Sequence, residues 1–238
     1  MIDVVLPDAV ATFTTRQGGV SEGPYSSLNL GILTDDDPAR VSRNREIVAD
    51  KLGIDAAAVV MGWQVHGAQI AEWNGPPPPG SDGYATPGAE LEKVDGHATT
   101  QEDLALLVLV ADCLPVALAA PGRVVMLHCG WRGMAEGIIE RALLGFDDPP
   151  AAAIGPGIGR CCYEVGDEVL AGFADLDNVA EGRMLDLRGV AEKKLRAAGV
   201  EQVEQVPLCT SCRPDLFFSH RRDGGVTGRQ AGMVRRSA

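Results

Sequence analysis

Three residues with metal-binding or nucleophilic side chains, His66, Cys113 and His128, each follow or end a run of apolar, strand-like residues. Strands that lie side by side bring their ends to one place, so we expect these side chains to meet. Imidazole and thiolate groups are ligands that zinc prefers, and catalytic zinc sites use three protein ligands and leave a fourth position for water or substrate. A zinc centre is therefore one interpretation of these residues, and three unrelated buried residues are the alternative, because the sequence contains no compact zinc motif.

The same residues also fit a second chemistry. Cys113 is a candidate nucleophile of a cysteine hydrolase, with His128 or His66 as its base and Asp112 as the group that orients the base. A thiolate both binds metals and attacks carbonyl carbons, so residue types by themselves leave the two hypotheses open. A third class, a non-catalytic binding protein, fits less well because three ligands leave one coordination position open.

The remaining cysteines raise the question of a second metal site. Cys209 and Cys212 form a Cys-x-x-Cys pair, which is typical of half a structural zinc site or of a redox pair. The nearest second pair is Cys161 and Cys162, and adjacent residues of a strand point to opposite faces. We therefore expect free buried thiols here and no four-cysteine site.

The elements that must position these side chains follow from hydrophobic periodicity and turn residues. The apolar runs 104–110 and 124–127 are typical of strands and lead to Cys113 and His128. Further strands are expected over 10–14, 59–65, 69–73, 151–154 and 203–206, with a last edge strand over 230–235. Helices are expected from Asp37-Pro38 to Gly53 and over 134–144, 167–173 and 187–198.

The arrangement of these elements predicts the fold class. Strands outnumber helices and do not alternate strictly with them, which favours an α+β fold with a mixed sheet over a doubly wound one. Consecutive prolines within residues 74–80 predict an exposed loop that continues to about residue 90.

Composition limits the functional classes. The chain has 238 residues, 45% of them apolar and 23% charged, as is ordinary for a soluble globular protein. It contains no run of 18 apolar residues and no secretory signal, so we expect a cytoplasmic protein with reduced cysteines. The formal net charge of -12 argues against nucleic acid or a membrane surface as the main partner, but it allows a small anionic substrate at a local arginine cluster. The sequence gives no indication of the oligomeric state.

Several motifs together carry a family resemblance. They are TTRQGGVSEGPYSSLNLG (14–31), NR (44–45), QVHG (64–67), VDG (94–96), ADCLPV (111–116), HCGWRG (128–133), IGPGIGRCCYEVG (154–166) and CTSCRPDLFFSHRRDGGVTGRQAG (209–232). With them the sequence resembles the laccase-domain, or polyphenol-oxidase-like, family of purine nucleoside phosphorylases. The resemblance covers more than three quarters of the chain, and its motifs occur in order.

This resemblance implies one domain over residues 1–238, a mixed β-sandwich surrounded by helices, with a catalytic zinc bound by His66, Cys113 and His128. The implied reaction is phosphorolysis of adenosine, inosine, guanosine or methylthioadenosine to the base and a ribose 1-phosphate, with some adenosine deamination. Cys129 and His97 depart from the family pattern, where alanine and an apolar residue are commoner, and neither departure removes a proposed ligand.

A multicopper oxidase activity is excluded by the number of histidines. Such an enzyme binds four coppers mainly through imidazole groups, and the chain contains four histidines in total. The resemblance instead implies purine nucleosides and phosphate as the substrates. Arg16 beside its glycine turn, Arg45 on the first helix and Arg132 near His128 are the expected anion contacts, because guanidinium groups match phosphate oxygens bidentately.

Overall fold

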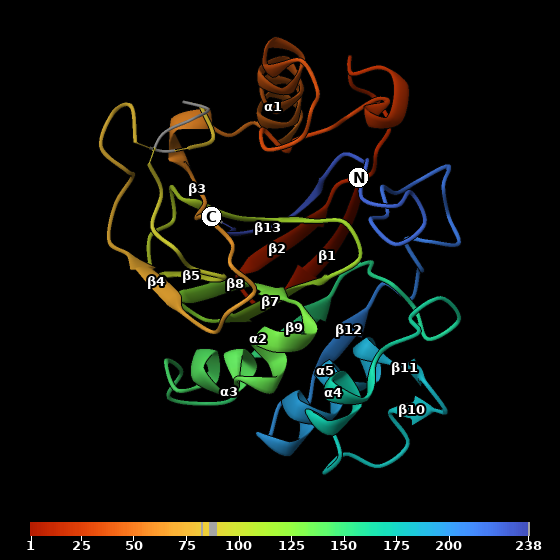
Figure 1. Ribbon diagram of the computed structural model, residues 1–238. Helices are drawn as coiled ribbons and strands as arrows, with labels where there is room; N and C mark the ends of the chain where they lie inside the picture. The colour runs from red at the N-terminus through yellow and green to blue at the C-terminus, as the bar shows by residue number, and fades with distance from the viewer. Residues whose placement is uncertain (82, 86–89, 238) are drawn as a thin grey trace.

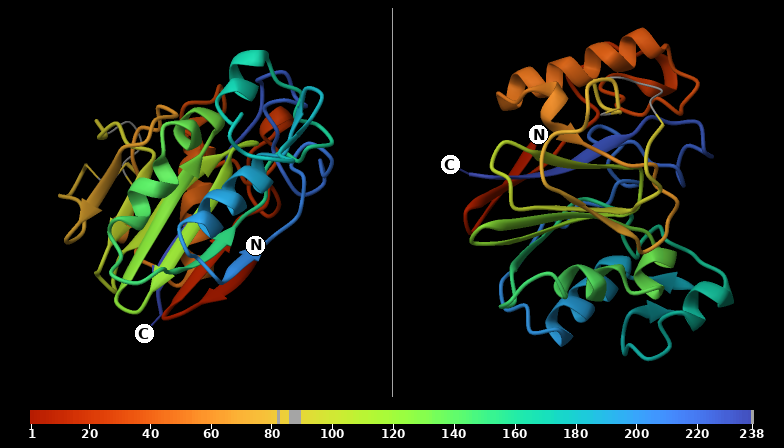
Figure 2. Two further views of the ribbon diagram at one scale, coloured as in Figure 1. Left: turned by 90° about the horizontal axis from the view of Figure 1, so that it is seen from below. Right: turned by 90° about the vertical axis from the view of Figure 1, so that its left-hand side faces the viewer.

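Two stacked β-sheets form the centre of the protein, and helices cover both outer faces (Figure 1). This computed structural model describes residues 1–81, 83–85 and 90–237. Figure 2 shows the four layers edge-on, with the longest helix on one side and the shorter helices on the other. The predicted α+β fold, a mixed β-sandwich surrounded by helices, is confirmed.

The strands divide between two large sheets and one small hairpin. The five-stranded sheet has the order β1 (Ile2–Leu6), β2 (Ala9–Phe13), β13 (Gln230–Arg236), β6 (Ala105–Val110), β3 (Val59–Val60). The six-stranded sheet has the order β12 (Val203–Gln205), β9 (Ala151–Ile154), β7 (Leu114–Ala120), β8 (Arg123–Cys129), β5 (Gly96–Thr99), β4 (Ile70–Trp73). The small hairpin consists of β10 (Ala180–Glu181) and β11 (Met184–Leu185).

The helices are one long α-helix, four shorter ones and two 3-10 turns in the described residues. They are α1 (Pro38–Leu52), α2 (Trp131–Ala135), α3 (Ile138–Leu143), α4 (Asp167–Ala171), α5 (Leu187–Ala197), η1 (Gly23–Tyr25) and η2 (Ala56–Ala58). Within the described part of the chain, none of them has the length and apolar character needed to cross a membrane.

Local signals explain the bounds of the helices. The Asp37 carboxylate caps α1 by accepting the N–H of Ala39, Pro38 stands in the first turn, and Gly53 ends the helix with a φ of 62°. The helix predicted over 134–144 is instead two helices, because Gly137 adopts a φ of 85° between α2 and α3.

Side chains alternate between the two faces of each strand, so some pack between the two sheets and others pack between a sheet and the helices. In β7, Val116 and Leu118 face the helices, whereas Ala117 and Ala119 face the other sheet. Small side chains recur between the sheets, namely Ala9, Ala11, Ala117, Ala119, Ala151 and Ala153. In β8 Met126 faces the other sheet, so the same alternation turns His128 toward the end of the space between the sheets.

Two strand predictions are wrong. The segment 230–235, expected at an edge, is the central strand β13, which pairs antiparallel with both β2 and β6. The strand expected over 59–65 ends at Val60, and residues 61–69 form an irregular segment that carries His66. Strand order and strand length both depend on partners far away in the sequence, which local patterns do not specify.

The proline loop lies away from Cys113. Pro76, Pro77 and Pro79 line a surface hollow together with Leu104 and Ala105, at the start of β6. Cys113 follows the opposite end of that strand, so residues 76–79 do not cover it. Part of the predicted continuation of the loop, residues 82 and 86–89, lies outside the described residues.

Candidate metal and active site

Three elements bring His66, Cys113 and His128 together. One ligand atom from each side chain lies within 4.8 Å of those of the other two. Cys113 lies where the chain crosses from β6 in one sheet to β7 in the other, and β7 pairs with β8 so that Pro115 is opposite His128. His128 is buried, Cys113 is half-buried and His66 is exposed, so the cluster opens to solvent on the His66 side.

Asp95 holds two of these residues in place. Its carboxylate is fully buried and accepts the backbone N–H groups of Val65, His66 and Gly67 at 2.8–3.1 Å. The same group lies 2.7 Å from Nδ1 of His128. Because an ionised carboxylate accepts only, Nδ1 carries the proton and Nε2 is left to the cluster. This carboxylate–imidazole pair is typical of the second shell of metal sites.

Strand register explains why Asp95 reaches His128. β5 pairs antiparallel with β8, with Gly96 opposite Leu127, so Asp95 is opposite His128, and the His128 N–H donates to the Asp95 carbonyl at 2.7 Å. Gln64 anchors the segment before His66, since its amide pairs with both backbone groups of Leu109 at 2.8 Å.

The charges of the cluster favour a thiolate. Burial raises the pKa of Cys113, but the positive charge of His128 and hydrogen bonds from His128 and His66 lower it by more. Burial lowers the pKa of His128, whereas Cys113 and Asp95 raise it by more, so its net direction is upward. Burial also raises the pKa of Asp95, yet its hydrogen bonds with His128 and Gly67 make the net shift downward. The thiolate is the form of cysteine that both ligates metals and acts as a nucleophile.

Asp112 shapes the backbone at Cys113 and does not orient a histidine. Its carboxylate accepts the Thr210 hydroxyl at 2.5 Å and the Arg221 backbone N–H at 2.7 Å. Its φ of 98° is rare for a residue with a side chain, and these two bonds hold it there. The prediction that Asp112 orients the imidazole is therefore wrong, because Asp95 makes that contact.

Two glycines of the HCGWRG motif permit close approach at the site. A Cβ on Gly130 would lie 3.3 Å from both the Cys113 sulfur and Cδ2 of His66. A Cβ on Gly133 would lie 2.5 Å from the carbonyl oxygen of Gly67, closer than real Cβ contacts. The start of α2 therefore packs directly against the His66 loop.

Cys129 and His97 lie outside the cluster. Cys129 is fully buried and belongs to the core beneath the helices, on the face of β8 opposite to His128. His97 is also fully buried, and its Nδ1 accepts the indole N–H of Trp73 at 3.2 Å. Cys129 and His97, which depart from the family pattern, are thus packing residues.

We expect His97 to make the stability of the protein depend on pH. Burial lowers its pKa to about 4, whereas an unfolded chain has a histidine pKa near 6.5, so the unfolded state binds more protons between these values. The contribution is complete above about pH 6.5 and is lost as the pH falls toward 4, by up to about 3 kcal/mol. Urea unfolding at several pH values measures it.

His97→Gln is the matched variant for this measurement. Its amide oxygen offers Trp73 an acceptor but does not titrate, so its free energy of unfolding should fall less than that of the wild type between pH 6.5 and 4.5. Parallel curves for the two proteins would show that His97 does not contribute to the pH dependence.

The structure places the predicted anion contacts in different surroundings. Arg16 donates to the carbonyls of Ser26 and Pro214, at 2.7 and 3.2 Å, and its guanidinium lies 4.6 Å from the centre of the Phe218 ring. It borders a shallow surface hollow. Arg132 is exposed, with its guanidinium 5.0 Å from the centre of the Trp131 ring, directly after the metal-site strand β8.

Arg45 has a packing role. It is 2% exposed and donates to the backbone carbonyls of Leu30, Gly83 and Tyr84 at 2.6–3.0 Å. These bonds tie α1 to two loops, and no described contact supports the anion-binding role predicted for Arg45.

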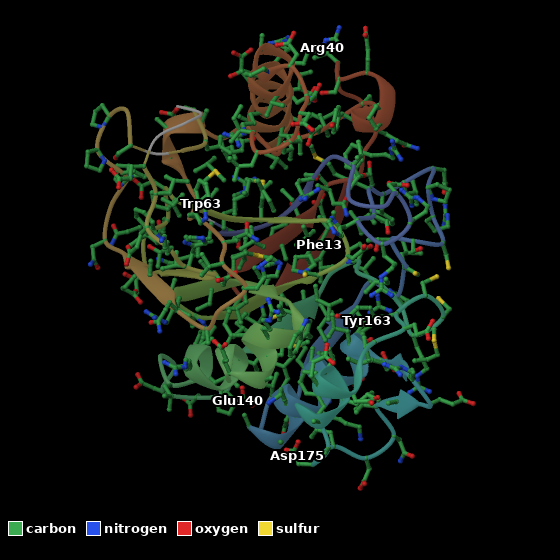
Figure 3. The ribbon with its side chains drawn as sticks, viewed as in Figure 1. Phe13, Arg40, Trp63, Glu140, Tyr163 and Asp175 are labelled. Atoms are coloured by element: carbon green, nitrogen blue, oxygen red, sulfur yellow. The ribbon has the colours of Figure 1, made fainter. Side chains whose placement is uncertain are left out.

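Sequence reasoning assigned no specific role to three residues near Cys113 or to Asp95, although two of the three are arginines of the C-terminal cluster. Tyr163, labelled in Figure 3, lies close enough to Cys113 that the thiolate, after burial, is the next cause raising the pKa of the phenol to about 12. The guanidinium of Arg221 lies 5.2 Å from the centre of the Tyr163 ring. Burial lowers the pKa of Arg229, and the nearby charge of Cys113 opposes that effect. The VDG and GRQ motifs were the available signals for Asp95 and Arg229.

Comparisons with known proteins identify relatives that align over nearly the whole chain. The chain is 39% identical over 240 residues to a Streptomyces coelicolor protein named purine nucleoside phosphorylase, covering 93% of each chain. It is 37% identical over 250 residues to the purine nucleoside phosphorylase YlmD of Geobacillus stearothermophilus, covering 96% of this chain and 90% of that protein.

Solved structures show the same fold. The crystal structure of YlmD from Geobacillus stearothermophilus matches with a TM-score of 0.89 and 36% identity, covering 97% of this chain and 93% of that one. A Neisseria meningitidis structure matches with a TM-score of 0.84 and 31% identity, covering 100% and 99% of the two chains. Residues 10–237 match the family described as multi-copper polyphenol oxidoreductase laccase. On sequence, fold and coverage alike, the chain belongs to this laccase-like family, whose relatives include proteins named purine nucleoside phosphorylase.

Proposed function

We propose that the protein is a zinc-dependent purine nucleoside phosphorylase that acts on adenosine, inosine, guanosine and methylthioadenosine. The observation that carries the proposal is the cluster of His66, Cys113 and His128, oriented by Asp95 and open to solvent on one side. Relatives named purine nucleoside phosphorylase align over nearly the full length of both chains, which supports the assignment. The six free cysteines are consistent with a cytoplasmic enzyme.

The donor set of the cluster fits zinc. Zinc bonds of about 2.0–2.3 Å to nitrogen and sulfur place tetrahedral ligand atoms roughly 3.5 Å apart, within the 4.8 Å spread of these side chains. A bound zinc ion would supply positive charge and one open coordination position beside the substrate. The four histidines of the chain are too few for a multicopper cluster, which favours zinc over the metal in the family's description.

Apart from the metal, the protein must position the phosphate and the nucleoside and must balance the charge of the phosphate. Phosphorolysis forms a bond between a phosphate oxygen and the anomeric carbon while the bond from that carbon to the base nitrogen breaks. We infer that Arg16, Arg132 and Arg229 hold the anionic phosphate, because a guanidinium fork matches two phosphate oxygens. Arg229 interacts electrostatically with Cys113, which supports its place beside the cluster. Fixing phosphate and nucleoside in line supplies much of the rate enhancement.

The test is incubation of the zinc-loaded protein with each of the four nucleosides, with and without phosphate, and identification of the products. We expect free base and the sugar 1-phosphate only when phosphate is present, and loss of both after chelation. The sugar product is ribose 1-phosphate from the first three nucleosides and 5-methylthioribose 1-phosphate from methylthioadenosine. Zinc-loaded protein that forms no sugar 1-phosphate from any of these nucleosides would rule out the assignment. Conversion of adenosine to inosine and ammonia without phosphate would identify the deaminase activity.

A cysteine hydrolase is the second candidate, and one observation favours it. Cys113, His128 and Asp95 are linked in the order of a nucleophile, a base and an orienting acid. Such an enzyme would form a covalent acyl intermediate on Cys113 and would keep its activity in the presence of a chelator. Mass spectrometry of the protein after mixing with ester and amide substrates distinguishes it from the phosphorylase.

A further inference from the structure

A second group of metal-binding side chains lies outside the site described above. The sulfur atoms of Cys161, Cys162, Cys209 and Cys212 all lie within 4.8 Å of one another. The Cys212 sulfur is 3.5 Å from that of Cys161 and 3.4 Å from that of Cys162. The two pairs come from loops that follow β9 and β12, about 50 residues apart in the sequence.

The expectation of free buried thiols that do not gather is wrong in two respects, because the four sulfurs meet and Cys161 and Cys212 are exposed. The reason why the sulfurs meet is local. Cys161 and Cys162 lie in a turn and not in a strand. The turn is closed by the Cys162 N–H, which donates to the carbonyl of Gly159 at 2.9 Å. The two-residue alternation of a strand does not apply there, so both sulfurs face Cys212.

The spacing of the sulfurs matches a tetrahedral thiolate site. Zinc–sulfur bonds of about 2.3 Å place the sulfurs of such a site about 3.8 Å apart. The two measured separations of 3.4 and 3.5 Å and the upper limit of 4.8 Å bracket this value. A disulfide requires about 2.05 Å, which neither measured pair approaches.

Hydrogen bonds and a β-bridge hold the loops around the sulfurs in place. The Gly159 N–H donates to the Cys209 sulfur at 3.2 Å, a bond that favours a thiolate acceptor. Gly157 forms a parallel bridge with Cys209, and the Thr210 N–H donates to the Gly157 carbonyl at 3.1 Å. The guanidinium of Arg188 interacts electrostatically with Cys209 and Cys161, which opposes the negative charge of clustered thiolates.

We propose that Cys161, Cys162, Cys209 and Cys212 bind a structural zinc ion, separate from the centre at His66, Cys113 and His128. Four protein ligands leave no open position, which is typical of zinc that stabilises a fold. The ion joins the loop after β9 to the loop after β12.

Residues next to the four-cysteine site also contact the residues around Cys113. Thr210, which follows Cys209, donates its hydroxyl to the Asp112 carboxylate at 2.5 Å. Asp112 precedes Cys113 and holds the left-handed backbone there. Tyr163, which follows Cys162, lies near Cys113 from the other loop. Zinc in the four-cysteine site thus fixes both loops that border the catalytic thiolate.

The primary experiment counts metal by mass spectrometry on protein purified under reducing conditions. We expect two zinc ions per wild-type chain, one in Cys212→Ser, and one in Cys113→Ala. Ser211→Ala is the matched control, because it changes the same turn without removing a sulfur, and it should retain two. One zinc per wild-type chain, unchanged in Cys212→Ser, would overturn the proposal.

A second measurement does not depend on the folding of Cys212→Ser. The Cys113→Ala protein, reconstituted with cobalt(II), should show strong thiolate-to-cobalt absorption, because four thiolates remain in the second site. Absence of that absorption, or a peptide map of the wild-type protein that shows a Cys162–Cys212 disulfide with one metal ion per wild-type chain, would replace the metal site by a redox pair. Metal counts do not involve nucleosides, so these results stand apart from the test for phosphorolysis.

Discussion

Cys113→Ala is expected to remove the zinc ion that we propose at His66, Cys113 and His128, and to reduce phosphorolysis by more than about 100-fold, beyond the usual cost of losing an outer-shell partner. Cys113 is the anionic member of the cluster, and its loss leaves two imidazoles with the buried Asp95 carboxylate behind one of them. Zinc content by mass spectrometry and ribose 1-phosphate formation, measured on the same preparation, check both parts.

Cys129→Ala is the control for Cys113→Ala. It also removes a thiol, but this thiol is buried on the opposite face of β8, so zinc content and activity should stay near those of the wild type. A Cys113→Ala protein that has lost the zinc ion of the His66, Cys113 and His128 cluster and still forms ribose 1-phosphate at the wild-type rate would eliminate the metal mechanism. A wild-type zinc count with lost activity would instead favour Cys113 as the nucleophile.

Asp95→Asn is expected to weaken zinc binding by about 10–100-fold, the usual effect of losing a second-shell carboxylate. The carboxylate accepts three backbone N–H groups of the His66 segment and contacts Nδ1 of His128. An asparagine has one acceptor oxygen, and its amide hydrogens would face some of these donors, which also costs about 1–3 kcal/mol of stability. Zinc titration against a competing chelator measures the affinity.

Recovery of activity at high zinc concentration distinguishes a positioning role of Asp95 from a purely structural role. At saturating zinc, folded Asp95→Asn protein should regain much of its phosphorolysis rate, because its ligands are present but less well oriented. Thermal unfolding establishes the temperature range in which the variant is folded. Wild-type zinc affinity in this variant would contradict the assignment of Asp95 as the residue that orients His128.

Local signals were sufficient where neighbours in the sequence determine the structure. Asp37, Pro38 and Gly53 mark the ends of α1 because capping and a left-handed glycine act within one helical turn. The motif resemblance likewise indicated the mixed β-sandwich. Sequence-based predictions failed where pairing with a distant segment decides the structure. An example is β13, which lies between β2 and β6 although it is the last strand of the chain.

By itself, the sequence determined the residue types that are able to bind metal, His66, Cys113 and His128, and their positions beside apolar runs. Only the tertiary structure showed that Asp95, 33 residues from His128, and not Asp112, orients the imidazole. It also gathered the four cysteines, which the sequence had suggested to be separate. Both outcomes depend on strand register and on turns that meet across the fold, and these are fixed by packing between segments far apart in the chain.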